Sequence, residues 1–234
     1  MRSPAPAAGS ATDSPLGRSL RRRHPSTAGL LPPFAGTISG SRNMAILAAS
    51  AMALKEWAVV CRALELGRQI ITLRKGGIHE RSGVFQTEQE QFWLYPTYEH
   101  QRREEIVAEA WPLLAEVESV AASATGTVRC QLYAQVQYAV ELRALEQALA
   151  LRGLHLWTEE VIRQRFAYKR PGLWLLVLRV YRLEQPHTVA ELPRYAGCRS
   201  WVTLEQPLPT TGAEPVLDEA AFAKRLAEIH RRLA

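Results

Sequence analysis

Aspartate is scarce in this sequence of 234 residues: it occurs only at positions 13 and 218, and every other acid is Glu. Metal-dependent phosphoryl transfer commonly uses Asp ligands, so the shortage argues against that class of enzyme. The sequence also has no HExxH, GxSxG, CxxC or GxGxxG motif. We therefore expect no metal site and no cofactor, and the sequence leaves open whether the protein is an enzyme.

Cysteine and long apolar runs are scarce as well. Cys61, Cys130 and Cys198 are far apart and odd in number, which disfavours a disulfide framework and predicts free thiols in a reducing, cytoplasmic compartment. The longest apolar candidate, residues 173–183, is interrupted by two arginines and is too short to cross a bilayer. We expect no membrane partner, and the oligomeric state is not indicated.

The positive charge is concentrated at one end of the chain. The net charge is +6, but residues 1–50 hold six Arg, no Lys and one acid, so residues 51–234 carry only +1. The overall charge is therefore no evidence for a nucleic-acid partner, and only a local cluster of basic residues can be.

Residues 1–50 are rich in Arg, Ser and Pro and have few periodic apolar positions, which predicts a disordered leader. An over-extended start of translation is favoured, with Met44 or Met52 as the real beginning. An organellar transit peptide is the alternative.

The rest of the chain alternates strand-like blocks with helix-like blocks. Because the strands come in blocks, the pattern favours an α+β fold with a single mixed, largely antiparallel sheet and packed helices. We assign residues 52–206 to this domain, 207–216 to a linker and 217–234 to a C-terminal helix. The predicted strands are 57–64, 69–74, 92–95, 128–142, 173–183 and 200–204, and the predicted helices are 98–111, 113–122, 142–149, 158–166 and 218–233. Residues 186–195 are predicted to be a connection. Thr97, Thr158 and Asp218 are the predicted N-caps of the helices that follow them, and Trp157 and Ile162 have the spacing of a hydrophobic staple.

Two segments combine basic residues with features of a binding surface. Arg74 and Lys75 leave a strand just before two glycines, which can offer cations and free amides to a phosphate, or can simply be a solvated turn. In residues 165–170, Arg165 and Lys169 are interleaved with aromatics, as in single-strand binding proteins, although a basic helix end is the simpler reading.

Other candidate residues are more isolated. Glu99 and His100, beside Tyr98, follow a strand and can serve as an acid and a base, although adjacent helical residues need not converge. Arg179 interrupts an apolar strand and is either part of a core ion pair or lines a pocket. Cys198 has no neighbouring base in sequence, so we expect it to be structural.

Several short blocks together resemble one bacterial family, the domain of unknown function 1802, seen often in cyanobacteria. The resemblance covers residues 53 to 207 and implies no catalytic residue, although it hints at partners of restriction or defence systems. The blocks are Lys55-Glu-Trp57, residues 73–78, 94–101, Arg165-Phe166, 178–183 and 195–202.

We expect a nucleic-acid-associated accessory or binding module, which requires the clusters at 74–75 and 165–170 to share one face. The first alternative is a small enzyme acting on a phosphorylated or nucleotide substrate, which requires Arg74, Lys75 and Arg179 to converge with Glu99 or His100. The second is a structural or partner-binding protein whose C-terminal helix docks on its own domain or on another chain.

Overall fold

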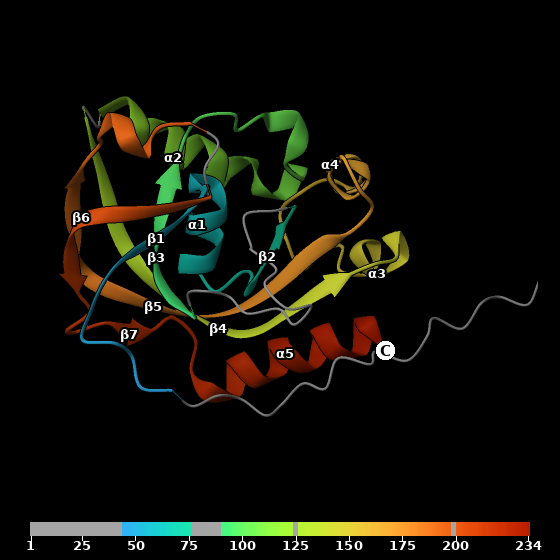
Figure 1. The fold of residues 1–234 in the computed structure, drawn as a ribbon. Coiled ribbons are helices and arrows are strands. Elements are labelled where there is room, and N and C mark those ends of the chain that lie inside the picture. The colour runs from blue at the N-terminus through green and yellow to red at the C-terminus, as the bar shows by residue number, and fades with distance from the viewer. Residues whose placement is uncertain (1–43, 76–89, 124–125, 198–199) are drawn as a thin grey trace, which may run out of the picture. The chain divides into compact units, whose positions relative to one another are not determined.

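One sheet organises the fold, with strands in the order β2-β5-β4-β3-β1-β6 and β7 paired to β5 (Figure 1). The computed structural model describes residues 44–75, 90–123, 126–197 and 200–234. Within these residues β1 and β3 pair in parallel and the other ladders are antiparallel. The predicted α+β class with a mixed, largely antiparallel sheet is confirmed.

The strands are β1 (Ala49–Trp57), β2 (Ile71–Arg74), β3 (Gln91–Thr97), β4 (Thr127–Leu142), β5 (Leu173–Ala190), β6 (Trp201–Pro209) and β7 (Glu214–Pro215). The helices are α1 (Ala58–Glu65), α2 (Trp111–Ser123), α3 (Leu145–Ala150), α4 (Glu159–Ala167) and α5 (Glu219–Leu233), and 3-10 turns span Arg103–Glu105, Ala108–Ala110 and Pro193–Tyr195.

Both faces of the sheet are buried. Along β3, Phe92 and Leu94 belong to the apolar cluster that includes the helices, whereas Trp93 and Tyr95 belong to a second cluster. Because successive side chains of a strand point to opposite faces, the central strands must be apolar on both sides. The prediction of a half-exposed strand at 128–142 is therefore wrong in its middle, where residues 132–137 are all buried.

The longest ladder joins β4 to β5, and its register shifts twice, between Cys130 and Leu132 and between Val136 and Tyr138. Such irregularities bend a strand and increase its twist. The strand β5 continues to Ala190, so the connection predicted from residue 186 is wrong in its first half. The reason is that residues 187–190 find partners in the start of β4.

Residues 57–64 form most of a helix rather than the predicted strand. The apolar run Ala58–Leu64 suggests a strand by composition, but α1 is buried on nearly every side, at Ala58, Val59, Val60, Cys61, Ala63 and Leu64. Apolar periodicity cannot distinguish such a helix from a buried strand. The helix lies across the bent sheet, with α2 beside it (Figure 1).

The helix predicted at 98–111 is also wrong, because the chain turns at Glu99 and His100 and continues as two 3-10 turns. His100 has a φ of 64°, a left-handed conformation that no α-helix contains. The side chain of Thr97 does not cap a helix, since its hydroxyl donates to the Glu56 carbonyl (3.2 Å).

The strand β6 lies at one edge of the sheet and replaces the first part of the predicted linker. In the irregular part of β6, between the pairs of Thr203 and Leu208 with β1, the Glu205 N–H donates to the Tyr195 hydroxyl oxygen (2.9 Å). The imidazole of His187 is 2.8 Å from the Pro209 carbonyl oxygen. Pro207 and Pro209 have no N–H, so this edge is rich in groups that cannot pair with a further strand.

The C-terminal helix α5 docks on the domain itself. Its apolar stripe of Phe222, Ile229 and Leu233 joins the main core cluster, as expected from its spacing. The carboxylate of Asp218 accepts a hydrogen bond from Ala221 N (2.7 Å), which confirms the predicted N-cap. The Thr158 cap of α4 is confirmed in the same way.

The first strand begins at Ala49, inside the segment that composition assigned to the leader. The carbonyls of Met44 and Ala45 accept hydrogen bonds from the Gln135 and Gln91 side chains. The remainder of the predicted leader, residues 1–43, lies outside the described residues. Among the described helices, none is both long enough and apolar enough to cross a bilayer.

Candidate nucleic-acid interface

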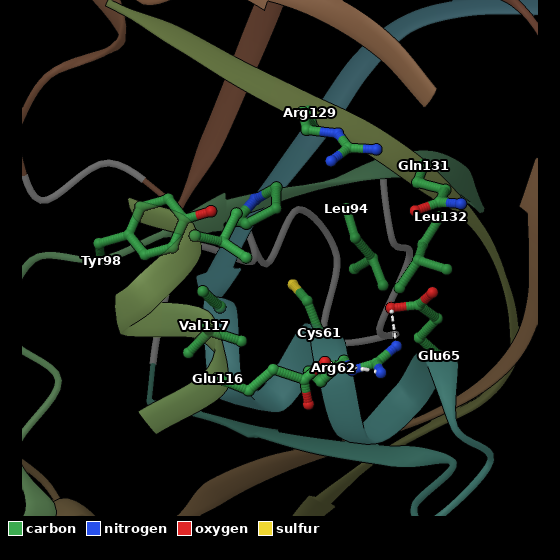
Figure 2. Close-up of a pocket in the computed structure, with 13 residues that line it drawn as sticks. Cys61, Arg62, Glu65, Leu94, Tyr98, Glu116, Val117, Arg129, Gln131 and Leu132 are labelled. Atoms are coloured by element: carbon green, nitrogen blue, oxygen red, sulfur yellow. Dashed lines mark ion pairs between the residues drawn. The ribbon is translucent and has the colours of Figure 1, made fainter. Parts of the chain in front are cut away.

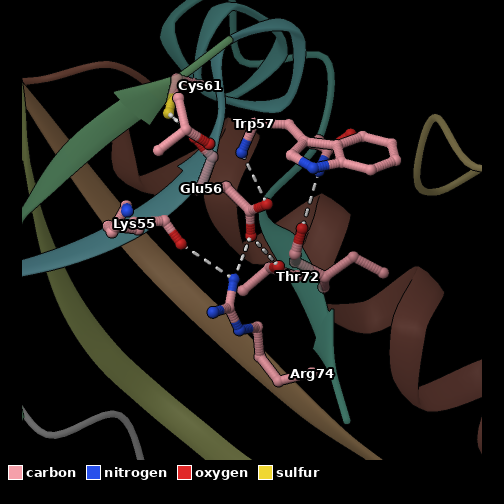
Figure 3. Close-up of polar contacts among 9 residues, drawn as sticks. Lys55, Glu56, Trp57, Cys61, Thr72 and Arg74 are labelled. Atoms are coloured by element: carbon pink, nitrogen blue, oxygen red, sulfur yellow. Dashed lines mark hydrogen bonds and ion pairs between the residues drawn. The ribbon is translucent and has the colours of Figure 1, made fainter. Parts of the chain in front are cut away.

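A buried carboxylate marks the junction between β1 and α1. Glu56 accepts hydrogen bonds from the Thr72 hydroxyl (2.5 Å), from Arg74 Nη1 (3.1 Å) and from the backbone N–H of Trp57 (2.9 Å) (Figure 3). Arg74 Nη1 also donates to the Lys55 carbonyl (3.1 Å). The charge of Arg74 is therefore neutralised inside the protein, in a satisfied buried pair.

The N-terminus of α1 is held by residues from the turn after β3. The side-chain oxygen of Gln101 accepts a hydrogen bond from the N–H of Val59 (2.9 Å), one of the amides that a helix leaves without an internal partner. Trp57 is the N-cap residue itself and makes no side-chain cap, so its indole is available to pack elsewhere.

The ammonium group of Lys75 closes the end of α4. It donates to the carbonyls of Phe166 (2.8 Å), Gly172 (2.9 Å) and Arg170. Burial, followed by the nearby Arg170, lowers the pKa of Lys75. Lys75 thus fixes the segment 166–172 next to β2, which brings the two predicted basic clusters together.

Arg165 differs from Arg74 and Lys75, because it has no hydrogen-bond acceptor among the described residues. Its guanidinium carbon lies 4.8 Å from the ring centroid of Trp57 and 5.1 Å from that of Trp157, within range for cation–π attraction. Within the described part of the chain it forms no ion pair and no hydrogen bond. Burial lowers the pKa of Arg165, the Glu56 carboxylate opposes this shift, and Arg74 adds to it.

Trp157 pairs with Ile106 in an isolated antiparallel β-bridge, which fixes its position. It is fully buried, and its ring is 5.6 Å from that of His155. Both ring nitrogens of His155 are buried, and neither makes a hydrogen bond of ordinary geometry among the described residues. Burial lowers the pKa of His155 to about 4, and Arg165 acts in the same direction, so the ring is neutral at pH 7.

The segment after α4 adds exposed cations and an exposed ring. Tyr168 is 59% exposed, and the Lys169 ammonium lies 5.3 Å from its ring centroid. Lys169 has a φ of 60° and Arg170 is exposed, so this turn presents its side chains to solvent. We call the following set the basic–aromatic surface: Trp57, Arg165, Tyr168, Lys169 and Arg170, with the buried Trp157 packed beneath Arg165.

The other predicted site residues lie elsewhere. Glu99 and His100 are exposed in the turn after β3, and neither contacts Arg74 or Lys75 through a hydrogen bond or ion pair in the described structure. Tyr98 is half-buried and lines a cavity beside α1. Arg179 is buried and pairs with the exposed Glu219 of α5 (2.8 Å), and it also lines a small pocket, so it has features of both predicted alternatives. Cys198 lies outside the described residues.

Sequence reasoning missed Glu56, Trp57 and Trp157 as members of this site. Trp157 was expected to pack against Ile162 ahead of the α4 cap, and both are buried. Nothing local in the sequence places it against Arg165. Glu56 and Trp57 stood out only as one block of the family resemblance. Described residues of three other blocks contact it: Arg74 at the Glu56 carboxylate, Thr97 at the Glu56 carbonyl and Arg165 over the Trp57 ring.

The fold and this surface define a class: a single-sheet α+β protein with a basic–aromatic surface next to a buried Glu–Arg pair. The chain belongs to the family described as "Domain of unknown function (DUF1802)", whose sequence model matches residues 53–228. No curated protein matches the chain.

Solved structures of an ASCH protein from Zymomonas mobilis are similar to this chain. One point variant is 12% identical over 76% of this chain and 94% of its own, with a TM-score of 0.37. The unmodified protein is 11% identical over 75% of this chain and 92% of its own, with a TM-score of 0.35. A likeness of this size carries no inference about function.

Proposed function

We propose that the protein is a nucleic-acid-binding module that holds single-stranded DNA or RNA on the basic–aromatic surface. The observation that carries the proposal is Arg165, a guanidinium packed on two indoles without an acidic partner among the described residues. A largely desolvated cation that forms no ion pair among the described residues favours an anionic ligand, and phosphate is one of the two anions, with carboxylate, that arginine binds through two parallel hydrogen bonds.

The exposed groups beside Arg165 support a single strand over a duplex. Tyr168 offers a ring face for a base, while Lys169 and Arg170 offer charges to the backbone. Single-strand binding commonly combines stacking on aromatic side chains with such a basic track. The link to restriction or defence systems that the family resemblance implies stays a prediction.

The enzyme alternative has less support. It requires Glu99 or His100 to converge with Arg74, Lys75 and Arg179, and the described residues place these groups apart or in internal pairs. The partner-binding alternative is weakened because α5 buries its apolar stripe on its own domain.

The test is fluorescence anisotropy of labelled single-stranded and double-stranded oligonucleotides with the full chain at two salt concentrations. We expect salt-dependent binding that prefers single strands and that weakens at least about tenfold in the Arg165→Ala/Lys169→Ala double variant. The control is Lys224→Ala/Arg231→Ala on α5, which removes the same charge from exposed positions.

Arg165→Lys separates charge from planarity. It keeps the positive charge but loses the flat group that lies over Trp57 and Trp157, so we expect a partial loss of affinity. Absent binding at low salt, or equal affinity in the double variant and its control, would contradict the proposal.

A further inference from the structure

A cavity of about 230 Å³ lies between α1, α2 and the strands β3 and β4, and it shares no residue with the basic–aromatic surface (Figure 2). Its wall is mostly apolar, which is typical of small-molecule sites. The apolar part is formed by Ala58, Cys61, Leu94, Pro96, Val117 and Leu132. With each water occupying about 30 Å³, the cavity has the volume of roughly seven or eight waters.

Most of the charge at this cavity is internally balanced. Arg62 donates to Glu65 (2.9 Å) and to Glu116 (2.8 Å), so α1 and α2 are joined by a cation between two carboxylates. The other carboxylate oxygen of Glu65, Oε1, lies 3.8 Å from Arg182 Nη1. The charges of Arg62, Glu65 and Glu116 therefore give no strong preference for a charged ligand.

Arg129 is the exception. It projects from β4 at the side of the cavity, and its guanidinium forms no hydrogen bond or ion pair within residues that the structure describes (Figure 2). It is close enough to Tyr98 to affect the pKa of that hydroxyl. Arg129 is exposed, so its guanidinium faces solvent at the edge of an apolar cavity and is accessible to an anion that enters it.

Two further polar groups face the same space. The Tyr98 hydroxyl points into the cavity (Figure 2), and burial raises its pKa, so it stays protonated and can donate a hydrogen bond. The Gln131 amide nitrogen donates to the Leu183 carbonyl (2.9 Å), which leaves its oxygen as an acceptor. The cavity thus combines a cation, a hydroxyl donor and an apolar wall.

We propose that this cavity is a binding site for a small organic anion, with one carboxylate or phosphate group on a compact apolar body. The anionic group would contact Arg129 and the Tyr98 hydroxyl, and the apolar body would lie against Leu94, Val117 and Leu132. This site is independent of nucleic-acid binding, so either proposal can fail without the other.

The test uses the full chain and ligand-observed NMR titration with three compounds of similar shape: benzoate, phenyl phosphate and neutral benzamide. We expect the better of the two anions to bind with a dissociation constant on the order of 1 mM, as for a ligand of this size. Benzamide should bind at least about fivefold more weakly, because it offers no charge to Arg129. Comparison of the two anions separates a carboxylate site from a phosphate site.

The variants locate the site. Arg129→Gln should remove the preference for the anion while leaving benzamide binding unchanged, and Tyr98→Phe should weaken the anion by a smaller factor. The matched control is Arg143→Gln, an exposed arginine just beyond the other end of β4. Equal binding of anion and amide, an unchanged preference in Arg129→Gln, or no binding of any compound would overturn the proposal.

Discussion

Arg165 and Arg179 are both arginines over aromatic rings, yet their surroundings differ. Arg179 lies 4.8 Å from the Phe222 ring centroid, and it donates to Glu219 (2.8 Å) and to the Asp218 carbonyl (3.4 Å). Arg165 has two indoles and no acceptor among the described residues. The first arginine is used to attach α5, whereas the second has donors left for a ligand.

The difference shows that a basic residue alone does not indicate a binding site, because its partners in the folded protein decide whether its donors remain available. Both arginines are candidate binding residues from the sequence, each with a structural alternative, and both lie against aromatic rings. What separates them is a carboxylate 40 residues further along the chain, which the folded structure brings to Arg179 and not to Arg165. Four measurements can test this contrast.

The largest effect should come from a third arginine, Arg74, because its partner Glu56 is a buried carboxylate. Glu56→Ala leaves Arg74 without its counter-ion and Thr72 without its acceptor, so we expect a loss of about 3–5 kcal/mol in the free energy of unfolding. Urea denaturation measures it. The control Glu219→Ala removes the exposed partner of Arg179 and should cost less than about 1 kcal/mol.

The second effect concerns the buried ring beside Arg165. His155 has a pKa of about 4 in the folded protein, below the value of an unfolded histidine, so the unfolded state binds more protons as the pH falls. Stability contributed by neutral His155 is complete above the unfolded pKa of about 6.5 and is lost as the pH falls toward 4, by up to roughly 3 kcal/mol.

The measurement is the free energy of unfolding from pH 7 to pH 4, compared with His155→Phe. Because carboxylates titrate in the same range, the difference between the two proteins is what isolates His155. Equal slopes for the two proteins would show that the ring is not a source of the pH dependence.

The third effect separates attachment from binding. Arg179→Ala removes the ion pair and the contact with Phe222, and we expect a loss of about 1–2 kcal/mol in unfolding free energy. Nucleic-acid affinity should not change, in contrast to Arg165→Ala. If Arg179→Ala is fully folded and still binds nucleic acid more weakly, the proposed difference between the two arginines is wrong.

The smallest effect is on salt dependence. Lys169→Ala should reduce the slope of log affinity against log salt by about one, as expected for the loss of one phosphate contact. Lys224→Ala on α5 should leave the slope unchanged. A similar change in both variants would indicate a general charge effect without a defined surface.

Much of the architecture could be predicted from the sequence. The period of two along 128–142 identifies β4, and Thr158 and Asp218 mark the starts of α4 and α5, because these signals are local. The helix α1 could not be recognised, since its residues are apolar on nearly every side. The turn at His100 was missed because nothing local requires a left-handed residue there.

The candidate site was predictable only in part. Arg165 and Lys169 were identified by their alternation with aromatics. The sequence analysis required the clusters at 74–75 and 165–170 to share one face, and Lys75 does contact the segment 166–172. The role of Trp57 depends on its contact with Arg165, in a distant part of the chain, and that of Glu56 on contacts with residues 16 and 18 positions away. Local patterns cannot contain such contacts, and the same limit applies to Arg129 and its cavity.

The outer side of β6 has a consequence for how copies of the protein meet. An exposed sheet edge can pair with a strand from another molecule, and repeated pairing of this kind causes aggregation. The N–H of Glu205 already donates to the Tyr195 hydroxyl, and Pro207 and Pro209 have no N–H. At the opposite end of the sheet order, β2 has only four residues. The β6 side of this sheet is therefore a poor template for growth into fibrils, even at high concentration.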